Sequence, residues 1–298
     1  MFVATNSACA NAGVLIVKHS GPDVNDYAPV SVSHSVNYSN ALADDLAYGA
    51  AALDTGTLKA AATFQLFDTN YWLSGTRRPE VVSQIQDQVT FSGPSPKVAV
   101  TLTLHFNGSF NMTGASGLGE IQISPFIELQ GLNALSAGID RLYNPSGFSN
   151  GGLAQDMVTS EFVGTPSAGS FLNATLTSVD GQLVMTTLVP TNTPISLFMQ
   201  LDLAFTQLTP GVRSQADFGH TATLSIALPA GYGYSSASGV LLTAAAVPEP
   251  SAFWLLALGL MVLVPRCTRS WCRKASETSV WHAACRVRRV ARITAQFG

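Results

Sequence analysis

The nine residues from Val98 to Phe106, VAVTLTLHF, decide the fold class of this chain. Large apolar side chains occupy every second position, and alanine, threonine and histidine occupy the positions between them. Successive side chains of a β-strand point to opposite faces, so this period of two predicts a strand with one face in a core and the other in water. The same pattern returns at 197–205 and at 218–228.

Shorter strand candidates cover much of the remaining chain, and turn clusters such as Gly93-Pro94-Ser95-Pro96 separate them. These candidates are 30–38, 61–67, 88–92, 120–128, 170–176 and 182–188. Many short strands in a charge-poor chain predict an all-β body, an antiparallel β-sandwich or jelly roll. Residues 41–53 stay open between helix and strand, because Asp44-Asp45 and Gly49 interrupt an otherwise helix-compatible stripe.

Charge is distributed unevenly along the chain. Residues 1–247 hold seven Lys/Arg and sixteen Asp/Glu, a net charge of −9, whereas residues 266–298 hold eight Lys/Arg and one acid, a net charge of +7. Basic residues beside an apolar segment stay on the cytoplasmic side of a membrane, so this asymmetry predicts an acidic exported body and a basic cytoplasmic tail. An acidic body lacks the basic face that nucleic-acid binding needs, so no nucleic-acid partner is expected.

Metal and disulfide chemistry find little support in the sequence. Cys9 is the single cysteine before the apolar segment, so the body has no disulfide framework. Cys267 and Cys272 are spaced more widely than a zinc-ribbon pair. Asp44-Asp45 and the loop 144–156 offer oxygen ligands for calcium, but neither has the spacing of a calcium-binding loop. We therefore expect no metal and no cofactor.

The N-terminus contains two sites of the small-x-small type that signal peptidase cleaves, Ala8-Cys9-Ala10 and Ala10-Asn11-Ala12. No full apolar stretch precedes them. We interpret residues 1–12 as the remnant of a signal peptide whose start lies upstream, and residues 13–246 as the exported β-sandwich domain. The alternative is an ordinary N-terminal strand at 13–17.

The C-terminal quarter has a distinctive order of features. Val247-Pro248-Glu249-Pro250-Ser251 precedes an apolar run at 252–264. Thirteen residues make a helix of about 20 Å, shorter than the roughly 30 Å hydrocarbon core, so a short transmembrane helix must recruit flanking residues within 250–271. Basic residues then follow, namely Arg266, Arg269, Arg273 and Lys274.

This order of features resembles a PEP-CTERM sorting domain, here at 247–274. The resemblance implies an exosortase substrate from a Gram-negative bacterium, held in the inner membrane as a precursor through its C-terminal helix and then delivered to the cell surface or outside the cell. It implies that residues 247–251 are the sorting motif and that the basic residues orient the chain in the membrane. Exopolysaccharide is a candidate partner, because such proteins belong to bacteria that make a biofilm matrix.

The resemblance extends upstream through 216–224, 229–231 and 236–240, and residues 87–93 show a weaker resemblance of the same kind. One departure concerns the end of the chain, because family members usually stop soon after the arginines. Residues 275–298 are therefore either a genuine basic cytoplasmic tail or out-of-frame sequence appended by a frameshift.

Three functions remain open for the body. The leading one is a noncatalytic surface or matrix protein. The first alternative is a carbohydrate-binding module using the aromatic pairs Tyr71-Trp72 and Tyr232 to Tyr234. The second is a serine hydrolase, since Gly147-Phe148-Ser149-Asn150-Gly151 fits a nucleophile elbow and Asp217 and His220 follow in the required order. His220 lies on the same face of the predicted strand as Phe218 and Ala222, because all three are an even number of residues apart. That face points into the core, which disfavours catalysis by His220. We therefore expect that the protein is not an enzyme.

Overall fold

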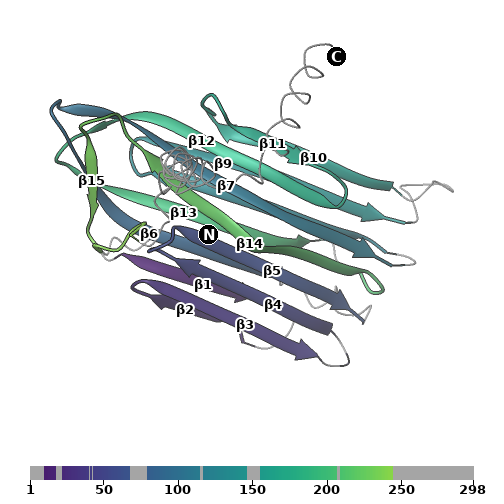
Figure 1. Cartoon of the computed structure of the whole chain (residues 1–298). Coiled ribbons are helices and arrows are strands. Elements are labelled where there is room, and N and C mark those ends of the chain that lie inside the picture. Colours follow the sequence, from purple (N-terminus) through teal and green to yellow (C-terminus); the bar gives the residue numbers. More distant parts are fainter. Residues whose placement is uncertain are drawn as a thin grey trace, which may run out of the picture. The chain divides into compact units, whose positions relative to one another are not determined.

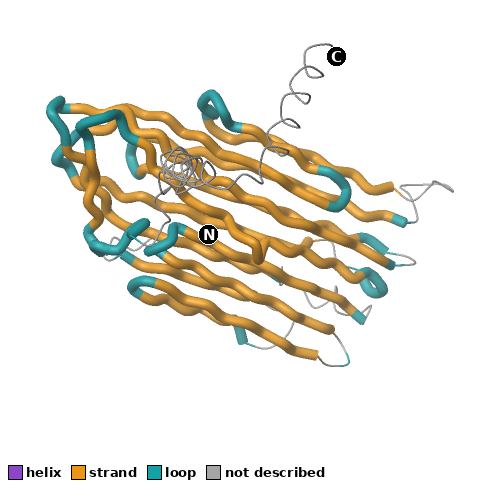
Figure 2. Tube along the Cα trace, in the orientation of Figure 1, coloured by secondary structure: helices purple, strands orange, loops and turns teal. Residues whose placement is uncertain are grey.

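The computed structural model describes residues 10–243, apart from 18–21, 40, 42, 68–78, 115–116, 146–154 and 207–208. These residues belong to one compact unit, Met1–Ala245, and a second unit comprises Ala246–Gly298. In the described residues the regular elements are strands, and every strand pairing is antiparallel, which confirms the prediction of an all-β antiparallel body (Figures 1 and 2). The predicted C-terminal transmembrane helix lies outside these residues, and within them no helix has the length and apolarity that a bilayer crossing requires.

The described strands form two sheets, which we call sheet A and sheet B. Sheet A has the order β10-β9-β8-β13-β6-β1-β2, and β15 also pairs with β6. Its strands are β1 (Asn11–Val17), β2 (Val24–Ala28), β6 (Glu80–Ser92), β8 (Gly119–Leu129), β9 (Asn133–Asn144), β10 (Gln155–Gly164), β13 (Pro194–Thr206) and β15 (Gly233–Ser236). Sheet B has the order β11-β12-β7-β14-β5-β4-β3. Its strands are β3 (Ser31–Ser39), β4 (Ala43–Ala52), β5 (Thr57–Leu66), β7 (Lys97–Thr113), β11 (Phe171–Ala174), β12 (Ser178–Pro190) and β14 (Arg213–Ala227).

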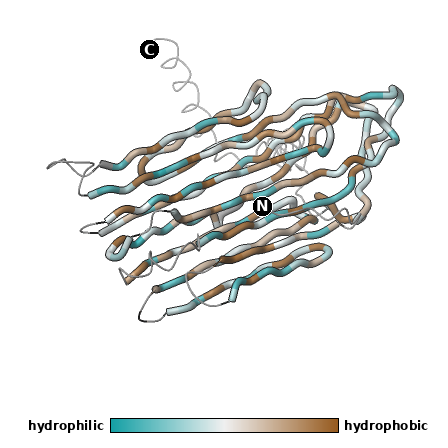
Figure 3. Tube along the Cα trace, turned by 180° about the vertical axis from the view of Figure 1, so that it is seen from behind, coloured by the Kyte–Doolittle hydropathy of each residue, from teal (hydrophilic) through white to brown (hydrophobic). Residues whose placement is uncertain are grey.

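The hydrophobic core lies between the two sheets and takes one face of each strand. In β7 the alternate residues from Val98 to Phe106 are buried, as are those of β13 from Leu197 to Phe205. Figure 3 shows the resulting alternation of apolar and polar residues along the strands. Burial of each large aliphatic or aromatic side chain contributes roughly 1.5–3 kcal/mol, so this pattern is the main source of stability.

The two sheets approach closely where β4 and β5 face sheet A. The rings of Phe64 in β5 and Phe205 in β13 meet edge to face, with centroids 4.7 Å apart and planes at 72°. A Cβ atom on Gly49 of β4 would lie 2.6 Å from Cγ1 of Val14 in β1. Close sheet packing therefore explains the inward-facing small residues of the ambiguous stretch, namely Ala43, Ala47, Gly49 and Ala51, and residues 43–52 of that stretch form strand β4.

Strand β14 contains an irregularity that the period of two did not predict. Its register with β5 and β7 shifts between Phe218 and Ala222. Within this β-bulge the Gly219 amide donates a 2.8 Å hydrogen bond to Oδ1 of Asp217. The predicted inward face is confirmed at Phe218, Ala222 and Leu224, which are buried, but the residues between 218 and 222 belong to a bulge and do not follow the pleat. Parity therefore no longer tells which way His220 points, and its side chain is outside the described part of the structure.

Candidate functional site

The described part of the chain ends in a segment that is bound to both sheets, and we call residues 233–243 the C-terminal clasp. Its first part is β15, in which Tyr234 pairs with Phe91 of β6. The chain then continues along β6, where the Ala237 amide donates to the Gln88 carbonyl at 2.8 Å. The clasp therefore begins as an additional strand of sheet A.

A buried carboxylate fixes the middle of the clasp. Asp87 of β6 is 2% exposed, and its Oδ2 accepts a hydrogen bond from the Ser238 hydroxyl. Its Oδ1 accepts from the Ser238 amide at 3.3 Å and from the Gln88 amide at 2.8 Å. A buried charge is tolerated where donors surround it, and hydrogen bonds to a carboxylate are stronger than those between neutral groups. Asp87 thus has the contacts that hold Ser238 in place.

The end of the clasp crosses to sheet B. The Leu242 amide donates to the Leu53 carbonyl, in the β4–β5 turn, at 2.9 Å. Leu242 has φ 58° and Gly56 has φ 61°, both in the left-handed region. A Cβ atom on Gly56 would collide with Cδ2 of Leu242, so glycine is favoured there both by its backbone conformation and by the space that it leaves for the Leu242 side chain. Leu241 is buried beside this contact.

The clasp extends the folded body closer to the sorting motif than the sequence predicts. The small-residue stretch from Val240 to Val247 predicts a tether, but Leu241 is buried and the Leu242 amide is bonded to the body, while Val240 and Thr243 close a turn around them. The Thr243 amide and hydroxyl both donate to the Val240 carbonyl, at 3.1 Å and 2.8 Å. That part of the tether prediction is wrong, because the buried side chain of Leu241 and the Leu242 amide attach to the body.

Sequence reasoning singled out both halves of the clasp without connecting them. The segments 87–93 and 236–240 each carry part of the family resemblance, and the structure brings Asp87 and Ser238 together. The sequence of β6 did hold a sign of this contact, because Asp87 points to the same face of the strand as the buried residues Ile85 and Val89. An acidic residue at an inward position needs hydrogen-bond donors, which the sequence alone did not identify.

The predicted sorting and orientation residues lie outside the described residues. They are Val247, Pro248, Glu249, Pro250, Ser251, Arg266, Arg269, Arg273 and Lys274. Ser149, the aromatic pair Tyr71-Trp72 and the cysteines Cys267 and Cys272 lie outside them as well. The roles given to these residues therefore stay predictions.

Of the three residues in the hydrolase alternative, Asp217 is the one whose side chain is described. Asp217 uses Oδ1 to accept the Gly219 amide inside the β14 bulge. This contact gives the carboxylate a local role in the backbone of the bulge. The partnership of Ser149, Asp217 and His220 stays a prediction.

The aromatic residues around β15 pack onto the body. Tyr232 and Tyr234 are half-buried against the core, and the ring of Tyr234 lies 6.3 Å from that of Phe91 at an angle of 51°. A Cβ atom on Gly93 would collide with the Tyr232 ring, so that glycine makes room for it. Burial raises the pKa of Tyr234, and its phenol stays neutral at physiological pH. The two rings thus help to hold β15, which differs from the exposed platform that the sequence suggested.

The two candidate calcium regions have different surroundings. In β4, Asp45 is buried and Asp44 lies on the opposite face. In the other region, Oδ2 of Asp156 accepts a hydrogen bond from Nη2 of Arg141 at 3.2 Å. The guanidinium of Arg141 lies 5.1 Å from the centroid of the Phe110 ring. In the stretches covered by the structure, no three His, Cys, Asp or Glu side chains gather as metal ligands.

Comparison with known proteins identifies one feature of the chain. The family described as the PEP-CTERM protein-sorting motif matches residues 246–269. No curated protein and no solved structure matches the chain. The chain therefore carries a PEP-CTERM sorting motif that begins three residues after the last clasp residue, Thr243. The motif implies an exported protein of a Gram-negative bacterium that an exosortase processes.

Proposed function

We propose that this protein is a noncatalytic component of the cell surface or extracellular matrix, delivered by exosortase processing of an inner-membrane precursor. The observation that carries the proposal is the sorting motif at 246–269, which directly follows an all-β body closed by its own C-terminal clasp. A folded body that ends so near the motif suits a protein whose sorting signal is removed after export.

The chemistry of the motif supports recognition by a membrane enzyme. Pro248 and Pro250 favour an extended backbone, and Glu249 is the sole Asp, Glu, Lys or Arg between Asp217 and Arg266. An enzyme at the membrane face therefore has one shaped and charged feature to bind. Moving the arginines that follow across hydrocarbon is costly, so they hold the C-terminal side in the cytoplasm.

The noncatalytic role fits the contact made by the one nominated catalytic side chain that the structure describes. Oδ1 of Asp217 accepts a hydrogen bond from the Gly219 amide within the β14 bulge, which gives this carboxylate a structural role. The candidate calcium ligand Asp156 likewise has a structural partner, since it pairs with Arg141.

Processing can be tested in a host that has an exosortase, with a tag at each end of the chain. We expect the natural chain to lose the segment after Ser251 and to be found outside the inner membrane. The double change Glu249→Ala with Pro250→Ala should leave uncleaved precursor in the inner membrane. Glu277→Ala is the matched control, because it removes a carboxylate from the same C-terminal region outside the matched residues. Equal processing of all three proteins would refute the proposed sorting function.

A further inference from the structure

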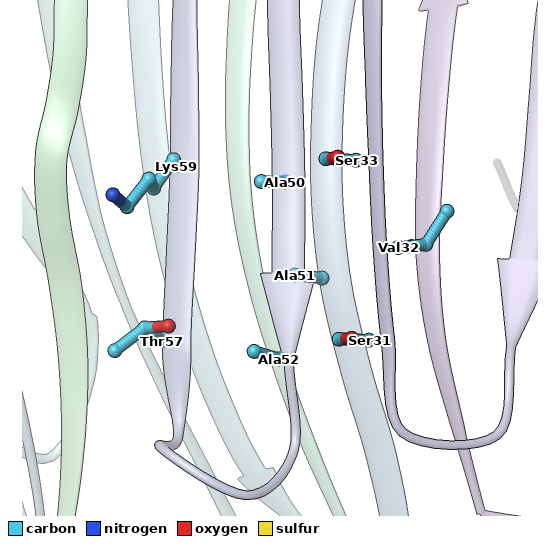
Figure 4. Close-up of a pocket in the computed structure, with 8 residues that line it drawn as sticks. All are labelled: Ser31, Val32, Ser33, Ala50, Ala51, Ala52, Thr57 and Lys59. Atoms are coloured by element: carbon cyan, nitrogen blue, oxygen red, sulfur yellow. The ribbon is translucent and has the colours of Figure 1, made fainter.

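The outer face of sheet B contains a hollow of about 250 Å³ over β3, β4 and β5 (Figure 4). Its outward-facing lining consists of Ser31, Ser33, Ala50, Ala52, Thr57 and Lys59. In Figure 4 the side chains of Thr57 and Lys59 point to the same side as those of Ala50 and Ala52, whereas Val32 points to the opposite side. We call this hollow the sheet B trough.

The register of the three strands explains why a trough forms. Ala50 lies between Ser33 and Lys59, and in the next row Ala52 lies between Ser31 and Thr57. The central strand contributes only methyl groups, while both neighbours contribute longer polar side chains. A floor of alanine with hydroxyl and ammonium groups along its sides follows directly from this pairing.

An exposed aromatic ring stands at one end of the trough. Tyr48 is on the same face of β4, one row before Ala50, and is 36% exposed. Its neighbours across the sheet are Ser35 and Ala61, which are too small to cover its ring. At about 3.4 Å per residue, the distance from Tyr48 to Ala52 is roughly 14 Å. The ring and the trough together make one elongated polar surface with an aromatic end.

The charge of the trough comes from Lys59. Among the described residues no acidic side chain forms an ion pair with its ammonium group. Asp217, on the neighbouring strand β14, directs Oδ1 to the Gly219 amide. The ammonium is thus available as a local positive charge for an anionic ligand, on a body whose net charge of −9 disfavours anions elsewhere on its surface.

We propose that the sheet B trough binds a saccharide that carries carboxylate groups. Hydroxyl side chains exchange hydrogen bonds with sugar hydroxyls, and an ammonium forms charge-assisted hydrogen bonds with a carboxylate. An exposed aromatic face packs on the apolar C–H face of a sugar ring. This proposal adds a class of ligand to the proposed surface or matrix role. It rests on that role in one respect, because only an exported protein meets extracellular saccharides.

Binding is tested with purified full-length protein in mild detergent and tetragalacturonate as the probe, by titration calorimetry. The fully methyl-esterified tetrasaccharide is the matched neutral ligand, since it keeps the sugar rings and loses the charge. Lys59→Gln should weaken tetragalacturonate binding about tenfold, the loss of one charge-assisted hydrogen bond, and leave the ester unaffected. Tyr48→Ala should weaken both ligands.

Lys97→Gln is the control variant, because Lys97 is an exposed lysine of sheet B on β7, away from the trough. It should bind like the natural protein, and all variants should keep its β-type circular dichroism spectrum. Absence of binding, or equal losses from Lys97→Gln and Lys59→Gln, would overturn the proposal. Because the assay needs no exosortase, its failure is distinguishable from a failure of sorting.

Discussion

Asp87 and Ser238 are 151 residues apart in the chain, yet the carboxylate of Asp87 binds both the hydroxyl and the amide of Ser238. The contact attaches the last described segment of the body to β6, a strand near the middle of sheet A. The body is therefore complete only when residues close to its C-terminal end have reached this strand.

Removing the carboxylate of Asp87 should lower the free energy of unfolding more than removing the hydroxyl of Ser238. Asp87→Ala leaves three donors without their acceptor, and we expect it to lower the free energy of unfolding by about 1.5–3 kcal/mol. Ser238→Ala removes one of these bonds and also the longer one that the hydroxyl accepts from the Val240 amide at 3.2 Å, and it should cost about 1 kcal/mol. Urea denaturation of the full-length chain measures both, and the double variant should cost less than the sum of the two. Strict additivity would show that the two side chains do not interact.

The contact between Gly56 and Leu242 can be separated from backbone strain. Gly56→Ala introduces a Cβ atom at positive φ and in collision with Leu242. Gly131→Ala is the matched control, since Gly131 has φ 78° and no atom lies within 4 Å of the place that its Cβ would take. We expect the control to cost about 1–2 kcal/mol from strain alone and Gly56→Ala clearly more, as measured by thermal unfolding. Equal costs would argue against the clasp contact.

The buried pair of Arg141 and Asp156 should respond differently to the loss of each partner. Asp156→Ala leaves a guanidinium that is only 5% exposed, and we expect a loss of roughly 2 kcal/mol, below the range for fully buried pairs because Asp156 is partly exposed. Arg141→Met leaves a carboxylate that water can reach, so it should cost less. Combining the two changes should recover part of the loss from Asp156→Ala. A larger loss from Arg141→Met would contradict this order.

The position of β1 distinguishes the two candidate signal-peptidase sites. Cleavage after Ala10 leaves β1 intact from Asn11, whereas cleavage after Ala12 removes a buried alanine that pairs with Ile85 of β6. We expect N-terminal sequencing of the exported protein to begin at Asn11. A start at Gly13 would show that the protein tolerates the loss of the first two residues of β1.

Ser149→Ala provides a check of the noncatalytic proposal. We expect unchanged β-type circular dichroism and unchanged hydrolysis of small acyl esters, because no nucleophilic role is assigned to this serine. A saturable esterase activity that disappears with this single substitution would support the hydrolase alternative instead.

Local alternation predicted much of the body, because it depends only on the pleat of a strand. The strands around Val98 to Phe106 and Leu197 to Phe205 were predicted with the correct buried face. Strands β9 and β10 were not predicted. Between Leu135 and Ile139 of β9 the inward residue is Ala137, a weak hydrophobic signal, and inward Arg141 further obscures the pattern.

The candidate sites were less predictable, since they depend on pairings between distant segments. Tyr232 and Tyr234 look like an exposed aromatic pair in sequence, but the pairing of β15 with β6 places Tyr234 against the core, and Tyr232, just before β15, packs there as well. The trough requires β3 and β5 to flank β4, which no local pattern around Ala50 reveals. The sorting motif is the opposite case, because its order of residues can be recognised without any fold.

The two attachments of the clasp also define how the body would carry mechanical load. Tension applied through the chain beyond Thr243 reaches the bond between Leu242 and Leu53 first, and this bond passes force into sheet B. The contact between Ser238 and Asp87 is loaded next and passes force into sheet A, before the ladder of β15 and β6. Pulling at this end therefore loads sheet B before sheet A, and these two short contacts yield before β15 is peeled from β6.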